Sequence, residues 1–245
     1  MRRIAAVTFD LWDTLIQEHP GGSDRVADLR ISRIASILGS KGLAHAPEEI
    51  RAAYVKTGSF LELTWSKRKD MGARDQLLFM LSSIDDKLSG KLGRDDLAAI
   101  EKAYVESILD HPPRLLPGAK DALRAVKSKG YRVGLISNTG RTPGSVLRVV
   151  MQNMGILELF DTTTFSNEIL VRKPAEGAFR TTLDKLRVIP QAAVHVGDDA
   201  RSDVAGAKKA GMRAIQVLAD GAVRSSLADD HVSSLGDIVA RLEKL

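Results

Sequence analysis

The chain has 245 residues, of which 44% are hydrophobic and 27% are charged, and it contains no cysteine. This length and apolar content are sufficient for one large domain, or for a domain with an insertion, around a full hydrophobic core. The lack of cysteine excludes disulfides, thiolate metal sites and cysteine nucleophiles. It is typical of proteins in a reducing compartment, so we expect a cytoplasmic location.

The net charge is +5 and the sequence pI is about 9.4, which favours contact with anions. Because no tight cluster of Lys and Arg alternates with aromatic residues, we expect a small phosphorylated substrate as the partner and no nucleic acid. The apolar run before the first aspartate is too short for a secretory signal, and no run approaches the ~20 apolar residues of a membrane span. We expect no membrane contact, and the pattern does not indicate an oligomeric state.

The first part of the chain predicts one strand followed by a long helical region. The apolar segment Ile4 to Phe9 predicts a buried strand that ends at Asp10. Helical periodicity then extends from about residue 17 to residue 111, without a strong strand pattern. The three prolines and one glycine of residues 111–118 end the helical pattern.

From residue 119 onward, helical and strand patterns alternate. Alternation of this kind, with apolar strands, predicts a parallel sheet covered by helices on both faces. The first strand would join this sheet, and the helical region would then be an insertion. We expect helices at 119–129, 146–154, 178–186 and 204–210, and strands at 131–138, 192–199 and 213–218.

Polar residues follow three of the predicted strands. Asp10 follows the first, Ser137 and Asn138 end the second, and Asp198 and Asp199 end the third. Ligands of parallel α/β sheets bind beyond the carboxyl ends of the strands, so we expect these residues to share a site. Neighbouring carboxylates repel each other, so the pattern predicts a hard divalent cation with oxygen ligands, most simply Mg²⁺.

Ser137 and Asn138 can hydrogen-bond an oxyanion, and Lys173 in "VRKP" can supply positive charge to the same group. Together with the cation, these residues predict a phosphoryl site. Asp10 would be a metal ligand, or a ligand and also a nucleophile that forms an aspartyl-phosphate. Each residue alone has an ordinary structural explanation, such as a turn or a helix cap.

Four short motifs, in this order, resemble those of the haloacid dehalogenase superfamily. They are Asp10 to Leu15, Ser137 to Thr139, Lys173-Pro174, and Gly197 to Asp199 followed by Asp203. The similarity extends beyond the motifs and implies a Rossmann-like catalytic core. It also implies that the helical region is a cap domain, which closes over the site and selects the substrate. The expected boundaries are 1–16 and 114–245 for the core and 17–113 for the cap.

The resemblance implies a role for each motif residue. Asp10 becomes the nucleophile and a Mg²⁺ ligand, Trp12 a ligand through its main-chain carbonyl, and Asp198 the acidic ligand. Asp203 and Asp199 would support the metal and its waters. Ser137 and Asn138 would hold the phosphoryl oxygens, and Lys173 would neutralise Asp10 and the transferred group.

One position departs from the family pattern. Phosphatases of the superfamily usually have a second aspartate two residues after the nucleophile, where it acts as general acid and base, and here that residue is Trp12. Asp13 lies one residue further, where the family commonly has glycine. General acid–base catalysis typically contributes ~10²–10⁴-fold, so the missing acid predicts a slower enzyme or another proton donor.

Three interpretations follow. The first is a Mg²⁺-dependent phosphatase whose proton donor is Asp13, His19, water or the substrate, or whose leaving group is acidic enough to need none. The second is a 2-haloacid dehalogenase, because that branch also has an aromatic residue in place of the second aspartate, or a phosphonatase using a cap lysine. Against the dehalogenase, the acidic cluster of Asp198, Asp199 and Asp203 would repel its carboxylate substrate. The third is a metal- or phosphate-binding protein with little activity.

Two further expectations concern residues outside the motifs. Arg141, just after the second motif, is a candidate contact for a substrate anion, although arginines in loops are usually solvated. The same two interpretations apply to Arg172, which lies beside Lys173. His195 lies within a predicted strand, and we expect it to be structural.

Overall fold

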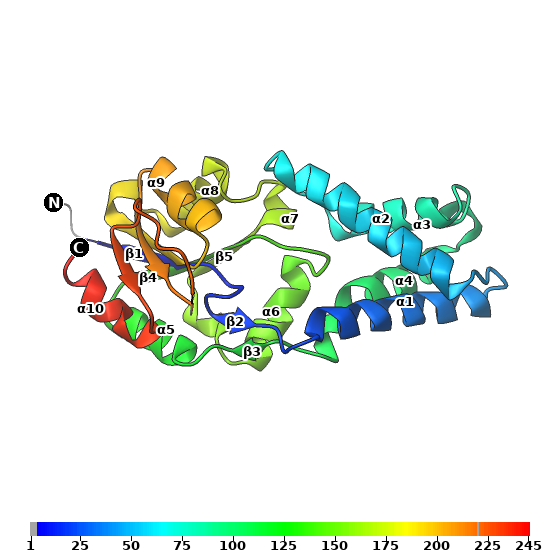
Figure 1. The fold of residues 1–245 in the computed structure, drawn as a ribbon, viewed down its shortest axis with the longest axis horizontal. Helices are drawn as coiled ribbons and strands as arrows, with labels where there is room; N and C mark the ends of the chain where they lie inside the picture. Colours follow the sequence, from blue (N-terminus) through cyan, green and yellow to red (C-terminus); the bar gives the residue numbers. More distant parts are fainter. Residues whose placement is uncertain (1–3, 220) are drawn as a thin grey trace.

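The computed structural model describes residues 4–219 and 221–245. A six-stranded sheet lies at the centre of one part of the molecule (Figure 1). All neighbouring strands are parallel and follow the order β5-β4-β1-β6-β7-β8. The predicted parallel α/β fold is therefore confirmed. The strands are β1 (Ala6–Phe9), β4 (Arg132–Ser137), β5 (Thr162–Phe165), β6 (Ala193–Gly197), β7 (Arg213–Val217) and β8 (Asp230–Val232).

Helices cover both faces of the sheet (Figure 1). Aliphatic residues of α5, α6 and α10 pack with the strands in one hydrophobic cluster, and α8 and α9 pack against the other face in a second cluster. The strands have apolar side chains on both faces, as buried parallel strands do. These elements are α5 (Ala119–Ser128), α6 (Gly144–Asn153), α7 (Ser166–Ile169), α8 (Glu176–Leu186), the π-helical turn Ala200–Ala205, α9 (Gly206–Lys209) and α10 (Ile238–Leu242).

β1 lies in the middle of the sheet, and this position explains why the polar strand ends converge. Phe9 is in register with Leu135 of β4 on one side and with Val196 of β6 on the other. The residues that follow these three strands therefore leave the same edge of the sheet side by side. Strands β5 and β8 were not predicted, because Thr162–Phe165 and Asp230–Val232 are too short and too polar to give a strand pattern.

The segment between β1 and α5 is helical, as predicted, and has its own hydrophobic core (Figure 1). We call α1–α4 the helical region. An antiparallel pair, in which Ile16 faces Leu115, joins the segments that lead into this region and out of it. The elements are β2 (Ile16–Gln17), α1 (Gly22–Ser40), α2 (Pro47–Ser66), α3 (Ala73–Ile84), α4 (Arg94–Glu106) and β3 (Arg114–Leu115).

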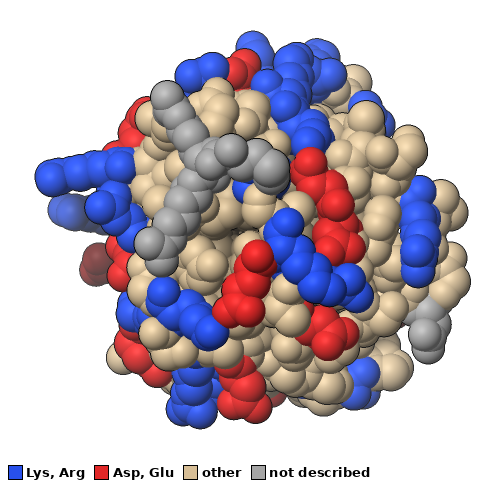
Figure 2. Space-filling model, turned by 90° about the vertical axis from the view of Figure 1, so that its left-hand side faces the viewer, with Lys and Arg blue, Asp and Glu red and all other residues tan. Residues whose placement is uncertain are grey.

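None of the helices among the described residues is both long and apolar enough to cross a lipid bilayer. Figure 2 views the end of the molecule that lies furthest from the helical region. On that face, Lys and Arg side chains alternate with Asp and Glu. Mixed charges of this kind form a solvated surface, not the continuous basic stripe that follows a nucleic-acid backbone.

Candidate active site

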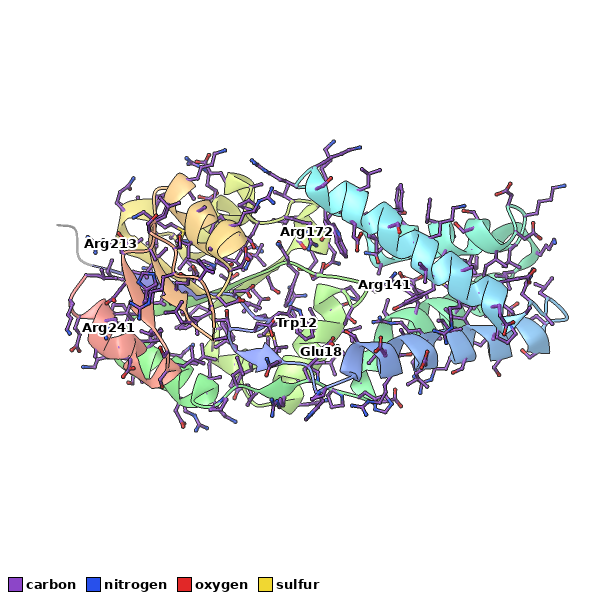
Figure 3. All side chains as sticks on the ribbon, in the orientation of Figure 1. Trp12, Glu18, Arg141, Arg172, Arg213 and Arg241 are labelled. Carbon is purple, nitrogen blue, oxygen red and sulfur yellow. The ribbon has the colours of Figure 1, made fainter. Side chains whose placement is uncertain are left out.

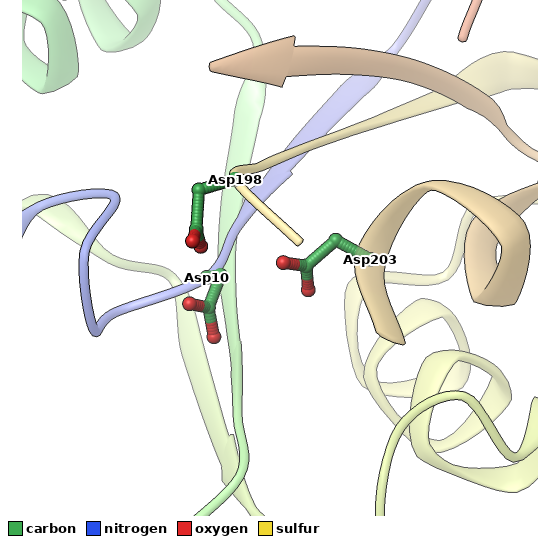
Figure 4. A group of neighbouring side chains, drawn as sticks. All are labelled: Asp10, Asp198 and Asp203. Carbon is green, nitrogen blue, oxygen red and sulfur yellow. The ribbon is translucent and has the colours of Figure 1, made fainter. Parts of the chain in front are cut away.

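Three carboxylates meet at the edge of the sheet (Figure 4). Asp10 follows β1, Asp198 follows β6, and Asp203 belongs to the helical turn Ala200–Ala205. One oxygen of each lies within 4.8 Å of the other two. The sequence predicted all three residues as metal ligands, and the fold brings them together.

Burial makes this cluster unfavourable for negative charge. It raises the pKa of Asp10 from 3.8 to about 7; the nearby Asp203 and Asp198 add to the rise, and Lys173 opposes it. Burial and the charge of Asp203 also raise the pKa of Asp198 to about 6. Oxygen ligands with excess negative charge are what Mg²⁺ prefers, so the donor set fits this cation.

Lys173 is the positive charge inside the cluster, and its side chain is almost fully buried. Its Nζ donates to Asp10 and, at 2.6 Å, to Oδ1 of Asp203. Burial alone would lower the pKa of Lys173, but Asp10 and Asp203 outweigh burial and raise it. Burial likewise opposes ionisation of Asp203, yet Lys173 and His195 hold its pKa below the usual value.

The second motif contacts the loop of the third motif, and its predicted role in holding phosphoryl oxygens stays a prediction. The side-chain oxygen of Asn138 accepts from the Lys173 main-chain N at 2.9 Å, and its Nδ2 donates to the Lys173 carbonyl at 3.1 Å. Both ends of the amide therefore hold the loop that carries Lys173. Ser137 is buried at the end of β4 and donates to the Asn138 carbonyl at 3.2 Å.

Further side chains hold the carboxylates in place, and the sequence had indicated no such role for them. His195, expected to be structural, bonds Oδ1 of Asp203 through Nε2 at 3.1 Å and Thr8 through Nδ1 at 2.9 Å. Burial lowers the pKa of His195, and the hydrogen bond to Asp203 opposes this effect. Thr14 donates to Oδ1 of Asp198 at 3.2 Å. Their signal was position only, since Thr14 and His195 lie close to motif aspartates in the sequence.

Gly197 allows the closest approach within the site. A Cβ atom at this position would lie 2.4 Å from Cγ of Asp203, closer than any packed side chain permits. The glycine of the fourth motif therefore makes room for the Asp203 carboxylate. Asp199, expected near the metal, instead caps the following helical turn by accepting from the main-chain N of Arg201 and Ser202.

Trp12 and Asp13 line different cavities. Trp12 is half-buried and lines a cavity of about 380 Å³ between the sheet and the helical region. Asp13 is exposed and lines a cavity of about 400 Å³ with Thr14 and Asp198. The φ angle of Asp13 is +55°, a conformation in which glycine carries no steric penalty. This conformation explains why glycine is common here in the family.

His19, predicted as one possible proton donor, is not among the residues that line the Trp12 cavity. His19 is exposed and lines a separate cavity with Pro112 and Pro113. The carboxylate that lines the Trp12 cavity close to His19 in the sequence is Glu18, which accepts a hydrogen bond from Ser23.

A second buried charge cluster joins the helical region to the loops of the second and third motifs. The side chain of Asp70 is fully buried and pairs with Arg172 at 2.8 Å. It also accepts from Trp65 Nε1 at 3.0 Å, from Thr139 Oγ1 at 3.3 Å and from Ser166. Arg172 is stacked 4.3 Å above the Trp65 ring. We call this cluster the Asp70 cluster.

Residues 4–211 match a family model described as haloacid dehalogenase-like hydrolase. Because the match spans most of the chain, the protein belongs to this family of hydrolases. The resemblance carried by the four motifs is thereby confirmed.

Curated relatives include phosphatases. The chain is 28% identical to a glyceraldehyde 3-phosphate phosphatase of Pyrococcus furiosus over 219 residues, which cover 88% of this chain and 81% of the relative. It is 27% identical over 217 residues to haloacid dehalogenase-like hydrolase domain-containing protein 3 of Xenopus laevis, covering 84% of this chain and 81% of the relative. A glyceraldehyde 3-phosphate phosphatase of Methanothermobacter thermautotrophicus is 34% identical over 123 residues, only 52% of its length.

Solved structures with the same fold include members of both enzymatic branches. A 2-haloacid dehalogenase from Pseudomonas syringae has a TM-score of 0.72 at 23% identity, covering 98% of this chain and 99% of its own. A phosphatase of the family from Thermococcus onnurineus has a TM-score of 0.63 at 22% identity and covers 98% of both chains. At these identities the likeness extends to the fold alone.

Proposed function

We propose that the protein is a Mg²⁺-dependent phosphatase that hydrolyses a small phosphorylated metabolite through an aspartyl-phosphate on Asp10. The observation that carries the proposal is the convergence of Asp10, Asp198 and Asp203 at one edge of the sheet, where the buried ammonium group of Lys173 contacts Asp10 and Asp203. Relatives named as phosphatases support it. The helical region would act as the cap that selects the substrate.

In this proposal, a carboxylate oxygen of Asp10 attacks phosphorus while the bond to the leaving oxygen breaks and that oxygen takes a proton. Water then attacks phosphorus, and the bond to Asp10 breaks to release inorganic phosphate. Lys173 orients the attacking carboxylate and offsets charge on the transferred group. The buried hydroxyl of Ser137 donates to a phosphoryl oxygen, and Asn138 holds the loop that carries Lys173.

Asp10, Asp198, Asp203 and the Trp12 carbonyl are the groups that would hold Mg²⁺. Bound there, the cation neutralises the phosphoryl oxygens and permits Asp10 to ionise. Because burial raises the pKa values of Asp10 and Asp198 to about 7 and about 6, removing the cation should leave the nucleophile partly protonated at neutral pH.

The indole of Trp12 cannot donate a proton to a leaving alkoxide at neutral pH. The proposed enzyme therefore favours leaving groups that need little protonation, such as acyl and aryl phosphates, or takes the proton from water or substrate. Asp13 stays a candidate for the acid, since it lines the same cavity as Asp198.

Dehalogenation is the second candidate, and Trp12 is the observation that favours it, because halide leaves without a proton. The acidic cluster disfavours it. A 2-haloacid carries a carboxylate, and two further carboxylates beside the nucleophile would repel that group. The cytoplasmic location remains part of the proposal and rests on the cysteine-free composition.

The test is phosphate release from a panel of alkyl, aryl and acyl phosphates, with Mg²⁺ or with EDTA, and halide release from 2-haloacids in parallel. We expect Mg²⁺-dependent phosphate release that is fastest for acyl and aryl phosphates. Halide release that is insensitive to EDTA, without phosphate release, would replace the proposal with the dehalogenase. Neither activity, in folded protein that binds Mg²⁺, would favour a binding protein.

A further inference from the structure

The cavity beside Trp12 lies where the sheet region meets the helical region (Figure 3). Its volume of about 380 Å³ is near the lower end of the ~300–1,000 Å³ of small-molecule sites. Trp12, Gly140, Arg141 and Thr142 line it from the sheet side, and the helical region contributes residues that include Arg30. It therefore has a size suited to a small metabolite.

Two arginines give this cavity positive charge that the protein does not neutralise. Arg30 is buried, with 6% of its surface exposed, and Arg141 is half-buried. Among residues 4–219 and 221–245, neither guanidinium forms an ion pair with a carboxylate. Buried arginine is almost always paired with an anion, because removing an unpaired charge from water is costly.

The hydrogen bonds of the two arginines distinguish their roles. Arg30 uses all three nitrogens: Nε donates to the Tyr104 carbonyl at 2.7 Å, NH1 to Tyr54 Oη at 3.2 Å, and NH2 to Thr142 Oγ1 at 2.7 Å. Arg141 donates from NH2 to the Tyr54 carbonyl at 2.9 Å and stacks 3.9 Å above the Tyr54 ring. Its Nε is buried and has no acceptor in the described part of the chain.

An unsatisfied buried donor destabilises the protein, and an incoming acceptor relieves this effect. Arg30 therefore serves as a fixed support that carries charge, whereas Arg141 retains a donor for a ligand. Because the guanidinium fork matches the geometry of carboxylate and phosphate, the ligand group that fits is an oxyanion.

The chain itself limits how far this oxyanion can lie from the reacting centre. Trp12 is two residues from Asp10, and Arg141 is four residues from Ser137 in the same loop. Extended chain spans at most ~3.6 Å per residue, so the main chain of Arg141 lies within about 14 Å of that of Ser137. A compact metabolite with two charged ends matches this limit.

The acidic residues of the cavity are Glu18 and Asp24, and both are exposed. They lie in solvent, whereas Arg30 is buried, so the positive charge is deep and the negative charge is at the mouth. Neither carboxylate pairs with Arg141 in the described part of the chain, so the free donor of Arg141 remains available to an anion.

We propose that the cavity between Trp12 and the helical region binds a second anionic group of the substrate, a carboxylate or a second phosphate, through Arg141. This proposal rests on the proposed phosphatase function and names its substrate class: small phosphomonoesters that are charged at both ends. Arg30 is a positioning residue that holds Thr142 and Tyr54 around Arg141.

Three compounds with one three-carbon chain test the proposal. Each carries a phosphate ester at one end, and the other end is a carboxylate (3-phosphooxypropanoate), a hydroxyl (propane-1,3-diol monophosphate) or a second phosphate (propane-1,3-diol bisphosphate). We expect the wild type to prefer one or both doubly charged compounds over the alcohol by about 10- to 100-fold in kcat/KM, the range for one charge-assisted hydrogen-bonded contact. The carboxylate and bisphosphate arms identify the source of the anion.

Two variants connect the preference to Arg141. In Arg141→Gln, the ratio of kcat/KM between a doubly charged compound and the alcohol should fall to near unity. The kcat/KM for the alcohol itself should fall much less than that for the doubly charged compound. Gly58→Ala disturbs the Arg141 guanidinium without changing residue 141. Its Cβ would lie 2.8 Å from NH2 of Arg141 and displace the flexible guanidinium. Alanine stabilises a helix interior relative to glycine, so α2 should not lose stability. Gly58→Ala should therefore also lower the preference, without lowering the melting temperature.

The matched controls are Gly39→Ala in α1, where a Cβ would meet nothing within 4 Å, and Arg124→Gln on the exposed face of α5. Both should keep the wild-type preference. Equal kcat/KM for all three compounds in the wild type, or an equal loss for all three in Arg141→Gln, would overturn the proposal.

If neither these esters nor any alkyl, aryl or acyl phosphate of the panel is hydrolysed with Mg²⁺, the phosphatase function itself is wrong, and binding measurements then test the second-anion site. Titration calorimetry with the same three compounds should show tighter binding of a doubly charged compound, lost in Arg141→Gln. Equal affinity for all three, or no measurable binding, would overturn the second-anion site as well.

Discussion

The carboxylate cluster at the sheet edge and the Asp70 cluster are both largely buried, yet the first has an excess of negative charge and the second is balanced. At the sheet edge, three carboxylates lie together and the Lys173 ammonium group contacts two of them, and burial raises the pKa values of Asp10 and Asp198 to about 7 and about 6. In the Asp70 cluster, one carboxylate meets one guanidinium and additional hydrogen-bond donors. The first cluster is incomplete without a cation, and the second is already satisfied.

This difference separates a site prepared for chemistry from a structural connection. An excess of one charge is unfavourable for the fold and is retained where a ligand compensates for it. A charge pair whose hydrogen bonds are satisfied instead holds two segments in place. Here the Asp70 cluster holds the helical region against the loops that carry Thr139 and Lys173. The main-chain bonds from Asp70 N to the Leu170 carbonyl and from Arg172 N to the Arg68 carbonyl, both 3.1 Å, reinforce this connection.

The largest effect should follow loss of the ammonium group that contacts Asp10 and Asp203 in the carboxylate cluster. Lys173→Met leaves Asp10 and Asp203 without their counter-charge, and we expect a loss of about 10²–10³-fold in kcat, comparable to removing a preorganised electrostatic donor. Breaking a buried pair from one side should also lower the free energy of unfolding by about 3–5 kcal/mol. Steady-state kinetics and urea denaturation measure the two effects.

The matched control is Lys208→Met, which removes a half-buried lysine at the surface whose Nζ lies 2.8 Å from Oδ1 of Asp229. It should change stability by less than about 1 kcal/mol. Equal effects of the two lysine substitutions would contradict the distinction between the buried cluster and an ordinary ion pair.

The Asp70 cluster should matter for stability and for closure of the helical region. Arg172→Met leaves a fully buried carboxylate without its cation, so we expect a loss of about 3 kcal/mol in the free energy of unfolding. Amide hydrogen exchange should increase around residues 67–71. Arg148→Met, which removes the more exposed pair with Glu168, serves as the comparison. An unchanged exchange pattern in Arg172→Met would show that the cluster does not hold the two regions together.

Magnesium should stabilise the protein, and more so at higher pH. Asp10 and Asp198 have raised pKa values in the fold, so in metal-free protein they favour folding below about pH 4 and lose this contribution as the pH rises toward 7. Mg²⁺ binds the ionised forms, and at 100 times its dissociation constant it should add about 2.7 kcal/mol. The increase in melting temperature should therefore be larger at pH 8 than at pH 5.5.

Asp198→Asn should weaken this response, and Asp121→Asn, on the exposed face of α5, should not. An identical increase in melting temperature at both pH values would mean that the cation binds elsewhere. Calorimetric titration of Mg²⁺ into the three proteins gives an independent measure of affinity.

Asp13 is expected to give the smallest effect. Asp13→Gly removes the carboxylate and keeps the left-handed backbone, since glycine adopts a φ of +55° without strain. If Asp13 is not the proton donor, the substitution should change kcat only slightly, and by the same factor for alkyl and aryl phosphates. A loss of 10²–10⁴-fold that is confined to alkyl phosphates would identify Asp13 as the general acid.

The sequence predicted the sheet and the carboxylate cluster well because both depend on local patterns. Apolar strands that end in Asp10, Ser137 or Asp198 must bring these residues to one edge once the sheet is parallel. The reciprocal bonding of Asn138 with Lys173 was not predictable, because it depends on how two loops separated by 35 residues meet. His195 was expected to be structural, and its contact with Asp203 depends on the path of the helical turn that follows β6.

The contacts of the helical region were still less predictable. Asp70 carries no motif, and a single aspartate after a helix is usually solvated. Its burial depends on packing of α2 against the loop that carries Arg172. The position of Arg141 beneath Tyr54 likewise depends on Gly58, whose missing side chain leaves the space. Such contacts arise between segments distant in sequence, so periodicity and spacing do not indicate them.

The central claim is that Asp10 takes up the phosphoryl group. Its most direct test is acid quenching of the wild-type protein during turnover of an acyl or aryl phosphate with Mg²⁺, followed by peptide mass spectrometry, with Asp10→Asn as the control. The account predicts a phosphorylated peptide whose modified residue is Asp10, absent in the variant and in EDTA. Phosphorylation of another residue, or an Asp10→Asn protein that still releases phosphate at the wild-type rate, would contradict it.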